Sequence, residues 1–114
     1  MMREDYSCEV EYDPEFDFLS FKRLNFKSTG SITAGSFTID FEKNTLSGIE
    51  VERATSLFQS FFGSKIDFSK ISKAKIGFQE KKNMMLLFFQ FVYENQVFSK
   101  DVVVAQVEPI PAVV

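Results

Sequence analysis

Three carboxylates stand at alternate positions near the N-terminus, within the stretch "YDPEFDF". Asp13, Glu15 and Asp17 have the spacing of the first ligands of a calcium loop, and paired acids can also perform general acid/base catalysis. However, that loop needs a glycine where this chain has Phe18, and a bidentate acid where it has Leu24. A metal-dependent enzyme using these three acids is therefore the third of three functional hypotheses. Asp13 and Asp17 also flank a turn, where short acids commonly bond the backbone.

Residues for other common kinds of catalysis are missing from the sequence. It has no histidine, which excludes Ser-His-Asp and Cys-His catalysis and histidine-based metal sites. Its one cysteine, Cys8, cannot form an internal disulfide, so we expect a reducing, cytoplasmic location. Cys8 falls on the apolar face of a predicted strand, which favours a buried, unreactive thiol over a nucleophile. We expect no catalytic residue, no metal and no cofactor.

The composition indicates one soluble domain with an uneven charge distribution. The 114 residues fit a single domain, expected over residues 1–108, with an extended tail over 109–114. The net charge of −3 disfavours nucleic-acid binding, and the most apolar window is too short for a membrane helix. Acids gather in the N-terminal hairpin and lysines in a later segment: Glu4, Asp5, Glu9, Glu11, Asp13, Glu15 and Asp17 against Lys65, Lys70, Lys73, Lys75, Lys81 and Lys82. These groups are either solvated faces or surfaces that steer a partner, including a second copy.

Hydrophobic periodicity predicts the elements that carry these residues. Alternation with a period of two, the N-terminal hairpin pattern and one continuous apolar run together predict seven strands, at residues 8–12, 16–24, 37–42, 49–52, 73–79, 84–93 and 97–107. The period then changes once, and one apolar stripe predicts a helix: Ala54, Leu57, Phe58, Phe61 and Phe62. Gly63 fits the C-terminal cap of this helix, because glycine takes a positive φ without a Cβ penalty.

Smaller signals predict the connections between these elements. Residues 25–35 are polar and read as a loop with at most a short strand end. Lys43 and Asn44 turn the chain, and Asn44 tolerates the left-handed conformation of such a turn. Gly48 marks a bulge or a close approach of two backbones, and Asp67 can cap a single helical turn.

The stretch "MMLLFFQFVY", residues 84–93, is apolar on both faces of its predicted strand. One face carries the candidate interaction residues, Met85, Leu87, Phe89, Phe91 and Tyr93, and the other carries Met84, Leu86, Phe88 and Val92. The predicted helix can shield only part of one face, so we expect a second subunit to cover the rest. The sequence therefore predicts a homodimer whose interface involves residues 84–106. If the sheet instead curls over its own second face, the 15 phenylalanines either form a packed core or line a cavity for a small apolar ligand.

The order of two motifs, "YDPEFDFLSF" and "FTIDFEKNTLSGIEVERATSLF", covers roughly residues 8–62. The residues that carry this pattern are Tyr12, Asp13, Pro14, Glu15, Asp17, Leu19, Ile39, Asp40, Gly48, Ile49, Glu50 and Ala54. The pattern resembles an uncharacterised prokaryotic family, domain of unknown function 2283. This resemblance implies two hairpins followed by a short helix, and it implies no active site. Family members are usually shorter and carry an Asp-Gly type turn where this chain has "EKNT", so the last three predicted strands extend the family pattern.

These observations predict an α+β fold, a mostly antiparallel sheet of about seven strands with one helix packed on one face. The leading functional hypothesis is a small cytoplasmic protein-interaction module, without catalytic activity, that forms a homodimer. The alternatives are a binder of a small apolar ligand in a Phe-lined cavity and a metal-dependent enzyme using Asp13, Glu15 and Asp17. We expect binding to neither nucleic acid nor a membrane.

Overall fold

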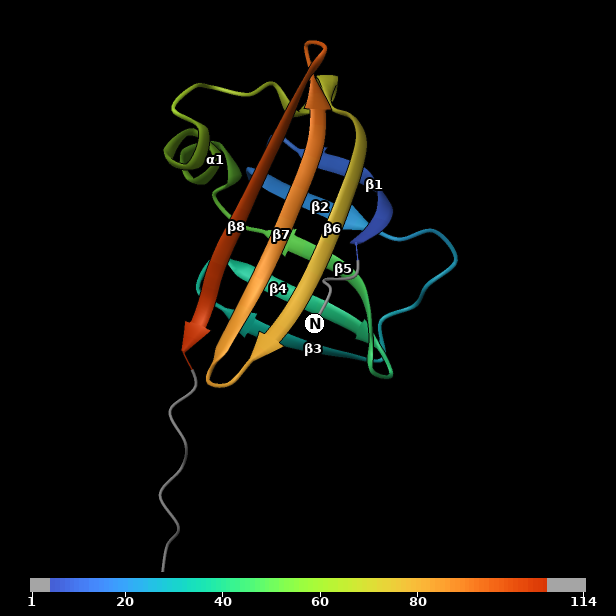
Figure 1. Cartoon of the computed structure of the whole chain (residues 1–114). Helices are drawn as coiled ribbons and strands as arrows, with labels where there is room; N and C mark the ends of the chain where they lie inside the picture. The colour runs from blue at the N-terminus through green and yellow to red at the C-terminus, as the bar shows by residue number, and fades with distance from the viewer. Residues whose placement is uncertain (1–4, 107–114) are drawn as a thin grey trace, which may run out of the picture.

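The computed structural model describes residues 5–106, whose strands form one curled antiparallel sheet (Figure 1). The strands are β1 (Asp5–Asp13), β2 (Phe18–Lys22), β3 (Gly30–Ala34), β4 (Phe37–Glu42), β5 (Thr45–Val51), β6 (Ser72–Lys81), β7 (Met84–Tyr93) and β8 (Gln96–Gln106). Helix α1 (Ala54–Phe62) and the 3-10 turn η1 (Phe68–Lys70) connect β5 to β6. The spatial order is β3-β4-β5-β2-β1-β6-β7-β8.

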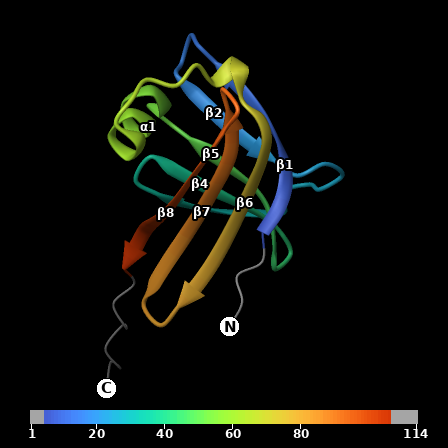
Figure 2. The same ribbon diagram turned by 45° about the horizontal axis from the view of Figure 1, so that its top comes forward.

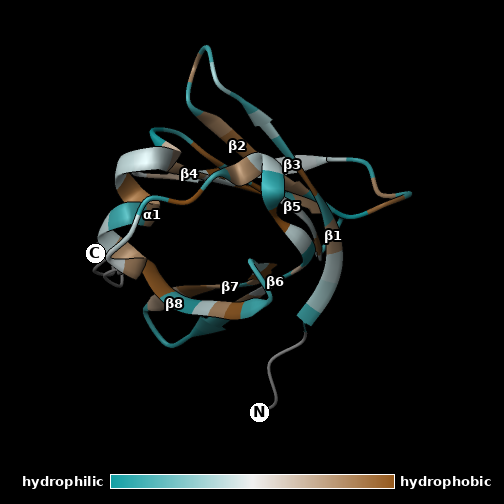
Figure 3. Ribbon diagram, turned by 90° about the horizontal axis from the view of Figure 1, so that it is seen from above, coloured by the Kyte–Doolittle hydropathy of each residue, from teal (hydrophilic) through white to brown (hydrophobic). Residues whose placement is uncertain are grey.

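Strand β1 is where the sheet bends into a half-barrel. Residues 9–13 of β1 pair with β2, whereas residues 5–8 pair with β6. Seen from above, β2–β5 and β6–β8 form two facing walls, and α1 lies at the gap between β8 and β4 (Figure 3). The curl lets the inner faces of the two walls bury each other, which removes apolar surface from water.

Phenylalanine rings fill the space between the walls. Phe21 on β2 lies 5.1 Å from Phe89 on β7, and Phe37 on β4 lies 5.9 Å from the same ring, measured between ring centroids. Phe58 of α1 lies 5.9 Å from Phe89. These distances are typical of favourable aromatic pairs. The many phenylalanines of the sequence thus form contacts of a packed core at this point.

Helix α1 has the bounds that the apolar stripe predicts. It ends at Gly63, whose φ of 74° is the left-handed conformation expected of a glycine cap. Its apolar face is not buried evenly, since Ala54 and Phe58 are fully buried while Phe61 and Phe62 stay half-buried. In a view turned by 45°, α1 covers only the upper end of the half-barrel, and the lower halves of β6–β8 extend beyond it (Figure 2).

The described sheet has eight strands, so the expected number of about seven is wrong. The strand that periodicity missed is β3, within the segment interpreted as a loop. Its one large apolar side chain, Ile32, is 41% exposed, because β3 is an edge strand with little contact to the core. A strand without a buried face leaves no period-two signal in the sequence.

Local turn chemistry agrees with most of the expectations. In the turn after β4 the left-handed residue is Lys43, with φ of 56°, and not Asn44. The β4–β5 ladder shifts register between Asp40 and Phe41, next to Gly48, where a bulge or close approach was predicted. Asp67 caps η1 as expected, because its carboxylate accepts hydrogen bonds from the Ser69 N–H and hydroxyl at 3.1 and 2.6 Å.

Two expectations concern features at the margins of the described chain. The expected tail, residues 109–114, lies outside the described residues, as do the ends of the predicted domain 1–108. Within residues 5–106, no helix has both the length and the apolar character that crossing a membrane requires.

Candidate functional site

The five residues predicted to form an interaction surface lie on the inner face of β7. Met85 is 7% exposed, and Leu87, Phe89 and Phe91 are fully buried. Tyr93 is half-buried, and its hydroxyl accepts a hydrogen bond from the Asp67 N–H at 3.2 Å. Their cover comes from the opposite wall and α1 of the same chain, since the sheet curls over this face. These side chains are therefore not an exposed surface of the single chain.

The opposite face of the same strand is only partly covered. Met84, Leu86 and Val92 are half-buried there, and the neighbouring β8 adds Val97 and Val103, which are 65% and 53% exposed. The ladder pairs Leu86 with Val103 and Val92 with Val97. With Phe88, these residues form what we call the outer apolar strip: Met84, Leu86, Phe88, Val92, Val97 and Val103.

Phe88 is the buried centre of this strip. It is 6% exposed although it points away from the core. Its cross-strand neighbours are Gly77 on β6 and Asp101 on β8. Since Gly77 has no side chain, the ring can lie over the backbone of β6, an arrangement known to protect glycines in sheets.

Charged side chains lie on one side of the outer apolar strip, on β6 and then β1. The exposed lysines of β6, Lys73, Lys75 and Lys81, lie beside it on the same face. The exposed acids of β1, Asp5, Glu9 and Glu11, occupy the next strand. The two charge groups seen in the sequence are thus partly neighbouring stripes of one surface.

The three acids of the "YDPEFD" stretch serve the local fold. The Asp13 carboxylate accepts a hydrogen bond from the Glu15 N–H at 3.0 Å, which is an Asx turn, and Glu15 is exposed. Asp17 points instead toward α1. Among residues 5–106, no group of three or more His, Cys, Asp or Glu side chains is arranged to hold a metal ion.

Asp17, in the turn between β1 and β2, caps the N-terminus of α1. Helix α1 begins after Arg53, which has a left-handed backbone and gives no side-chain cap. Asp17 replaces that cap, because its carboxylate accepts hydrogen bonds from the Thr55 N–H at 3.1 and 3.2 Å and from the Thr55 hydroxyl at 2.6 Å. The Tyr12 hydroxyl donates a fourth bond at 2.7 Å. Partial burial opposes ionisation of Asp17, but the bonds from Thr55 and Tyr12 outweigh it and lower the pKa.

Cys8 has the environment expected of a structural thiol. It is half-buried and packs against the core. Burial raises the pKa of the thiol to about 12, which disfavours the reactive thiolate at neutral pH.

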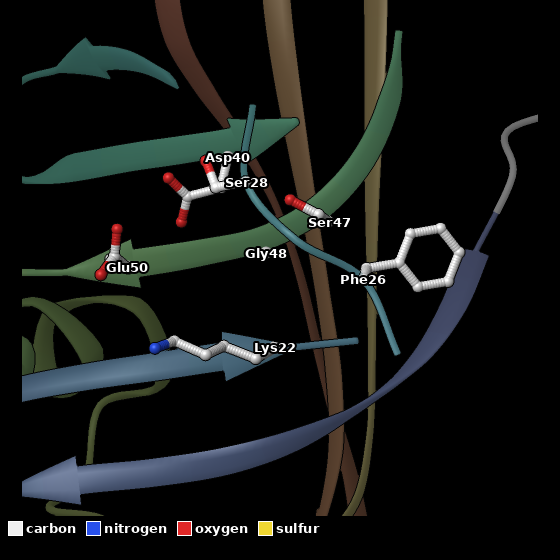
Figure 4. A pocket seen from close by; sticks show the side chains of 7 residues that line it. All are labelled: Lys22, Phe26, Ser28, Asp40, Ser47, Gly48 and Glu50. Carbon is white, nitrogen blue, oxygen red and sulfur yellow. The ribbon is translucent and has the colours of Figure 1, made fainter. Parts of the chain in front are cut away.

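A polar pocket lies on the outer face of the other wall (Figure 4). It encloses about 230 Å³ and is lined by Lys22, Phe26, Ser28, Asp40, Ser47, Gly48 and Glu50. Asp40, Gly48 and Lys22 stand side by side on β4, β5 and β2. Because Gly48 has no side chain, a hollow remains between the acid and the lysine. A Cβ at Gly48 would lie 3.0 Å from the Phe21 carbonyl oxygen and 3.6 Å from Asp40 Oδ2.

The loop from Arg23 to Thr29 carries Phe26 and Ser28 across this pocket. Both ends of the loop are held by the sheet, since the Arg23 N–H donates to the Ser47 carbonyl at 2.9 Å and the Thr29 N–H donates to the Phe41 carbonyl at 2.7 Å. The Arg23 guanidinium lies 3.7 Å from the centroids of two rings, Tyr6 and Phe26, and donates to the Leu46 carbonyl at 2.7 Å. Cation–π contacts on both sides thus fix the base of the loop.

The pocket concentrates buried polar groups. Of the three buried polar side chains of the described residues, Asp40 and Ser47 line the pocket, and the third, Ser20, is the cross-strand neighbour of Glu50. Asp40 accepts a hydrogen bond from the Ser31 hydroxyl at 2.6 Å. Partial burial, and then the neighbouring Asp40, raise the pKa of Glu50, while Lys22 offsets part of this effect.

Sequence reasoning did not single out this pocket. Alternation along residues 49–52 predicts only that Glu50 points away from the core, and it says nothing about which strand lies beside it. The one local signal was Gly48, whose missing side chain opens the hollow. Asp40, Gly48 and Glu50 also belong to the pattern that resembles the family domain of unknown function 2283.

Comparisons with family models, with curated proteins and with solved structures found no match to this chain. The resemblance to the family domain of unknown function 2283 therefore stays a prediction.

Proposed function

We propose that this protein is a non-catalytic interaction module that forms a homodimer through the C-terminal half of β8 and the adjoining outer apolar strip. The observation that carries the proposal is the open edge of β8. This strand has 11 residues and is the last strand of the described sheet. A long edge strand presents unpaired backbone donors and acceptors, to which another strand can bond.

Helix α1 contacts only the first half of this edge. Phe62 lies 5.4 Å from Phe98, and the Lys100 ammonium lies 5.7 Å from the Phe61 ring. Beyond Lys100 the strand runs past the end of α1, and Figures 1 and 2 both show its lower half clear of the helix. The free half of β8 begins with the sequence "DVVV", which favours strand pairing and contains no proline.

A second copy of the chain can pair with this edge, although the β7–β8 ladder shifts register directly after Val103. A two-fold axis at Val103 would place Val103 opposite Val103 of the partner subunit. It would also place Val102 opposite Val104 of the partner subunit. Such pairs of β-branched residues contribute roughly 0.2–1 kcal/mol each. In this register neither Lys100 nor Asp101 faces its own copy, so like charges are kept apart. Val103 of both subunits would then extend the outer apolar strip across the dimer.

The expected location is the cytoplasm. A chain with one cysteine, held as a half-buried thiol, suits a reducing compartment. This part of the proposal is independent of the dimer.

The proposed dimer is tested by light scattering at micromolar concentration. We expect a mass of about twice the 13.1 kDa chain. Val103→Lys should reduce it to the monomer mass, because a charge on an edge strand opposes pairing. The matched control is Ile32→Lys, the same kind of change on the opposite edge strand β3, which should stay dimeric. A monomeric wild type, or equal masses for the two variants, would overturn the proposal.

A further inference from the structure

The polar pocket over β2, β4 and β5 has the features of a ligand site that the proposed dimer does not use (Figure 4). We propose that it binds a small molecule carrying a primary ammonium group. In this site Asp40 and Glu50 hold the ammonium, Ser47 adds a hydrogen bond, and Lys22 contacts a hydroxyl or carboxylate at the other end of the molecule.

The first observation is the open hydroxyl of Ser47. Ser47 is 6% exposed and lines the pocket, yet its hydroxyl makes no hydrogen bond within residues 5–106. In that range no fully buried side-chain nitrogen or oxygen lacks a partner. The hydroxyl is therefore open to the pocket, where a ligand can satisfy it.

The second observation is a pair of neighbouring acids, Asp40 and Glu50, that form no direct ion pair with a cation among the described residues. Asp40 is 8% exposed, and it contributes to the raised pKa of Glu50 on the neighbouring strand. Lys22 lines the same pocket but forms no ion pair with either acid among the described residues. A primary ammonium has three N–H donors and no acceptor, so it can bond both carboxylates and the Ser47 hydroxyl at once. Charge-assisted bonds of this kind are the strong ones.

Size and charge limit the rest of the molecule. The volume of about 230 Å³ is below the range of roughly 300–1,000 Å³ typical of sites for drug-sized ligands, so the ligand has only a few heavy atoms. Lys22 repels a second positive charge at its end of the pocket and donates to an oxygen there. A hydroxyl or carboxylate next to the ammonium therefore fits better than a diamine.

Binding should strengthen as the pH rises. The charged groups that act on Glu50 are Asp40 from β4 and Lys22 from β2, while its direct cross-strand neighbours, Ser20 and Thr38, carry no charge. The raised pKa means that Glu50 holds a proton at a higher pH than a free glutamate. An ammonium competes with that proton, so affinity falls as the pH is lowered.

The test is an NMR titration of the ¹⁵N-labelled full chain with ethanolamine, with acetate as the control ligand. We expect ethanolamine at millimolar concentration to shift the amides of residues 47–50, with a weaker effect at lower pH, and acetate to leave them unchanged. Asp40→Asn should weaken binding about tenfold or more, since it removes a charged partner. Ser47→Ala keeps both charges and should weaken it less.

The matched control is Glu52→Gln, which removes an exposed acid at the end of β5 outside the pocket. This variant should bind ethanolamine like the wild type. Shifts that spread over the acidic face of β1, or that survive both Asp40→Asn and Ser47→Ala in folded protein, would overturn the proposal. The absence of any shift in the wild type would do so as well.

Discussion

Asp17 shows how one residue joins two distant parts of the chain. Three hydrogen bonds from Thr55 connect its carboxylate, in the turn after β1, to the first residues of α1, 38 positions later, and a fourth comes from Tyr12 on β1. The sequence predicted a structural role for this acid, because short acids near a turn commonly bond the backbone. It could not predict the partner, since Thr55 is reached only when the sheet brings the turn and the helix together.

The hydrogen bonds of Asp17 to the start of α1 should stabilise the folded protein. Asp17→Asn should lower the free energy of unfolding at neutral pH by about 1 kcal/mol, because the amide can still accept the cap hydrogen bond but loses the extra strength of bonds to a charged carboxylate. Because the folded pKa of Asp17 is lowered, its stabilisation is present above the unfolded value of about 3.9 and is lost as the pH falls through the folded value. The difference between variant and wild type should therefore shrink in acid. Urea unfolding at several pH values measures this difference in stability, with Glu15→Gln at an exposed position as control. A difference that stays constant with pH would contradict the prediction.

At the scale of elements, the helix and the edge strand β8 were predicted well, whereas the other edge strand, β3, was missed. Residues 54–62 form one apolar stripe, and a stripe of this period is a local property that needs no knowledge of the partner. The strand β3 escaped prediction because only Ile32 on it is large and apolar. The two faces of β7 were both identified, but their assignment needed the curl at β1, which no local pattern contains.

The helix carries the second stability prediction. Phe58 is fully buried, and its ring contacts Phe21, Phe68, Phe89 and Phe91 at centroid distances of 5.3 to 6.3 Å. Phe58→Ala should cost about 3–5 kcal/mol of unfolding free energy, and Phe58→Asp should unfold the domain. Ser60→Asp, on the exposed side of the same helix, is the control and should stay folded. Thermal melts followed by circular dichroism measure all three; an unchanged melting temperature for Phe58→Asp would mean that α1 does not pack on the walls.

At the scale of the whole molecule, the curl of the sheet decides which surface is left for a partner. It buries the inner face of β7 within one chain, and it leaves the outer apolar strip only partly covered and the edge of β8 unpaired in the described sheet. The interaction site predicted from residues Met85, Leu87, Phe89, Phe91 and Tyr93 is therefore replaced by one on the opposite face of the same strand. The expectation of a homodimer is kept, as a proposal, on this different surface.

The most direct test of the proposed dimer is a disulfide across its two-fold axis. In the proposed register Val103 lies opposite Val103 of the partner subunit, within the distance at which two cysteines in paired strands can bond. The measurement is non-reducing electrophoresis of Val103→Cys in a Cys8→Ala background after mild oxidation, with Val97→Cys in the same background as control. The account predicts a linked dimer for Val103→Cys and little for Val97→Cys, although Val97 is the more exposed of the two, because Val97 would lie far from its copy. No linked dimer for Val103→Cys, or equal linkage of both variants, would contradict it.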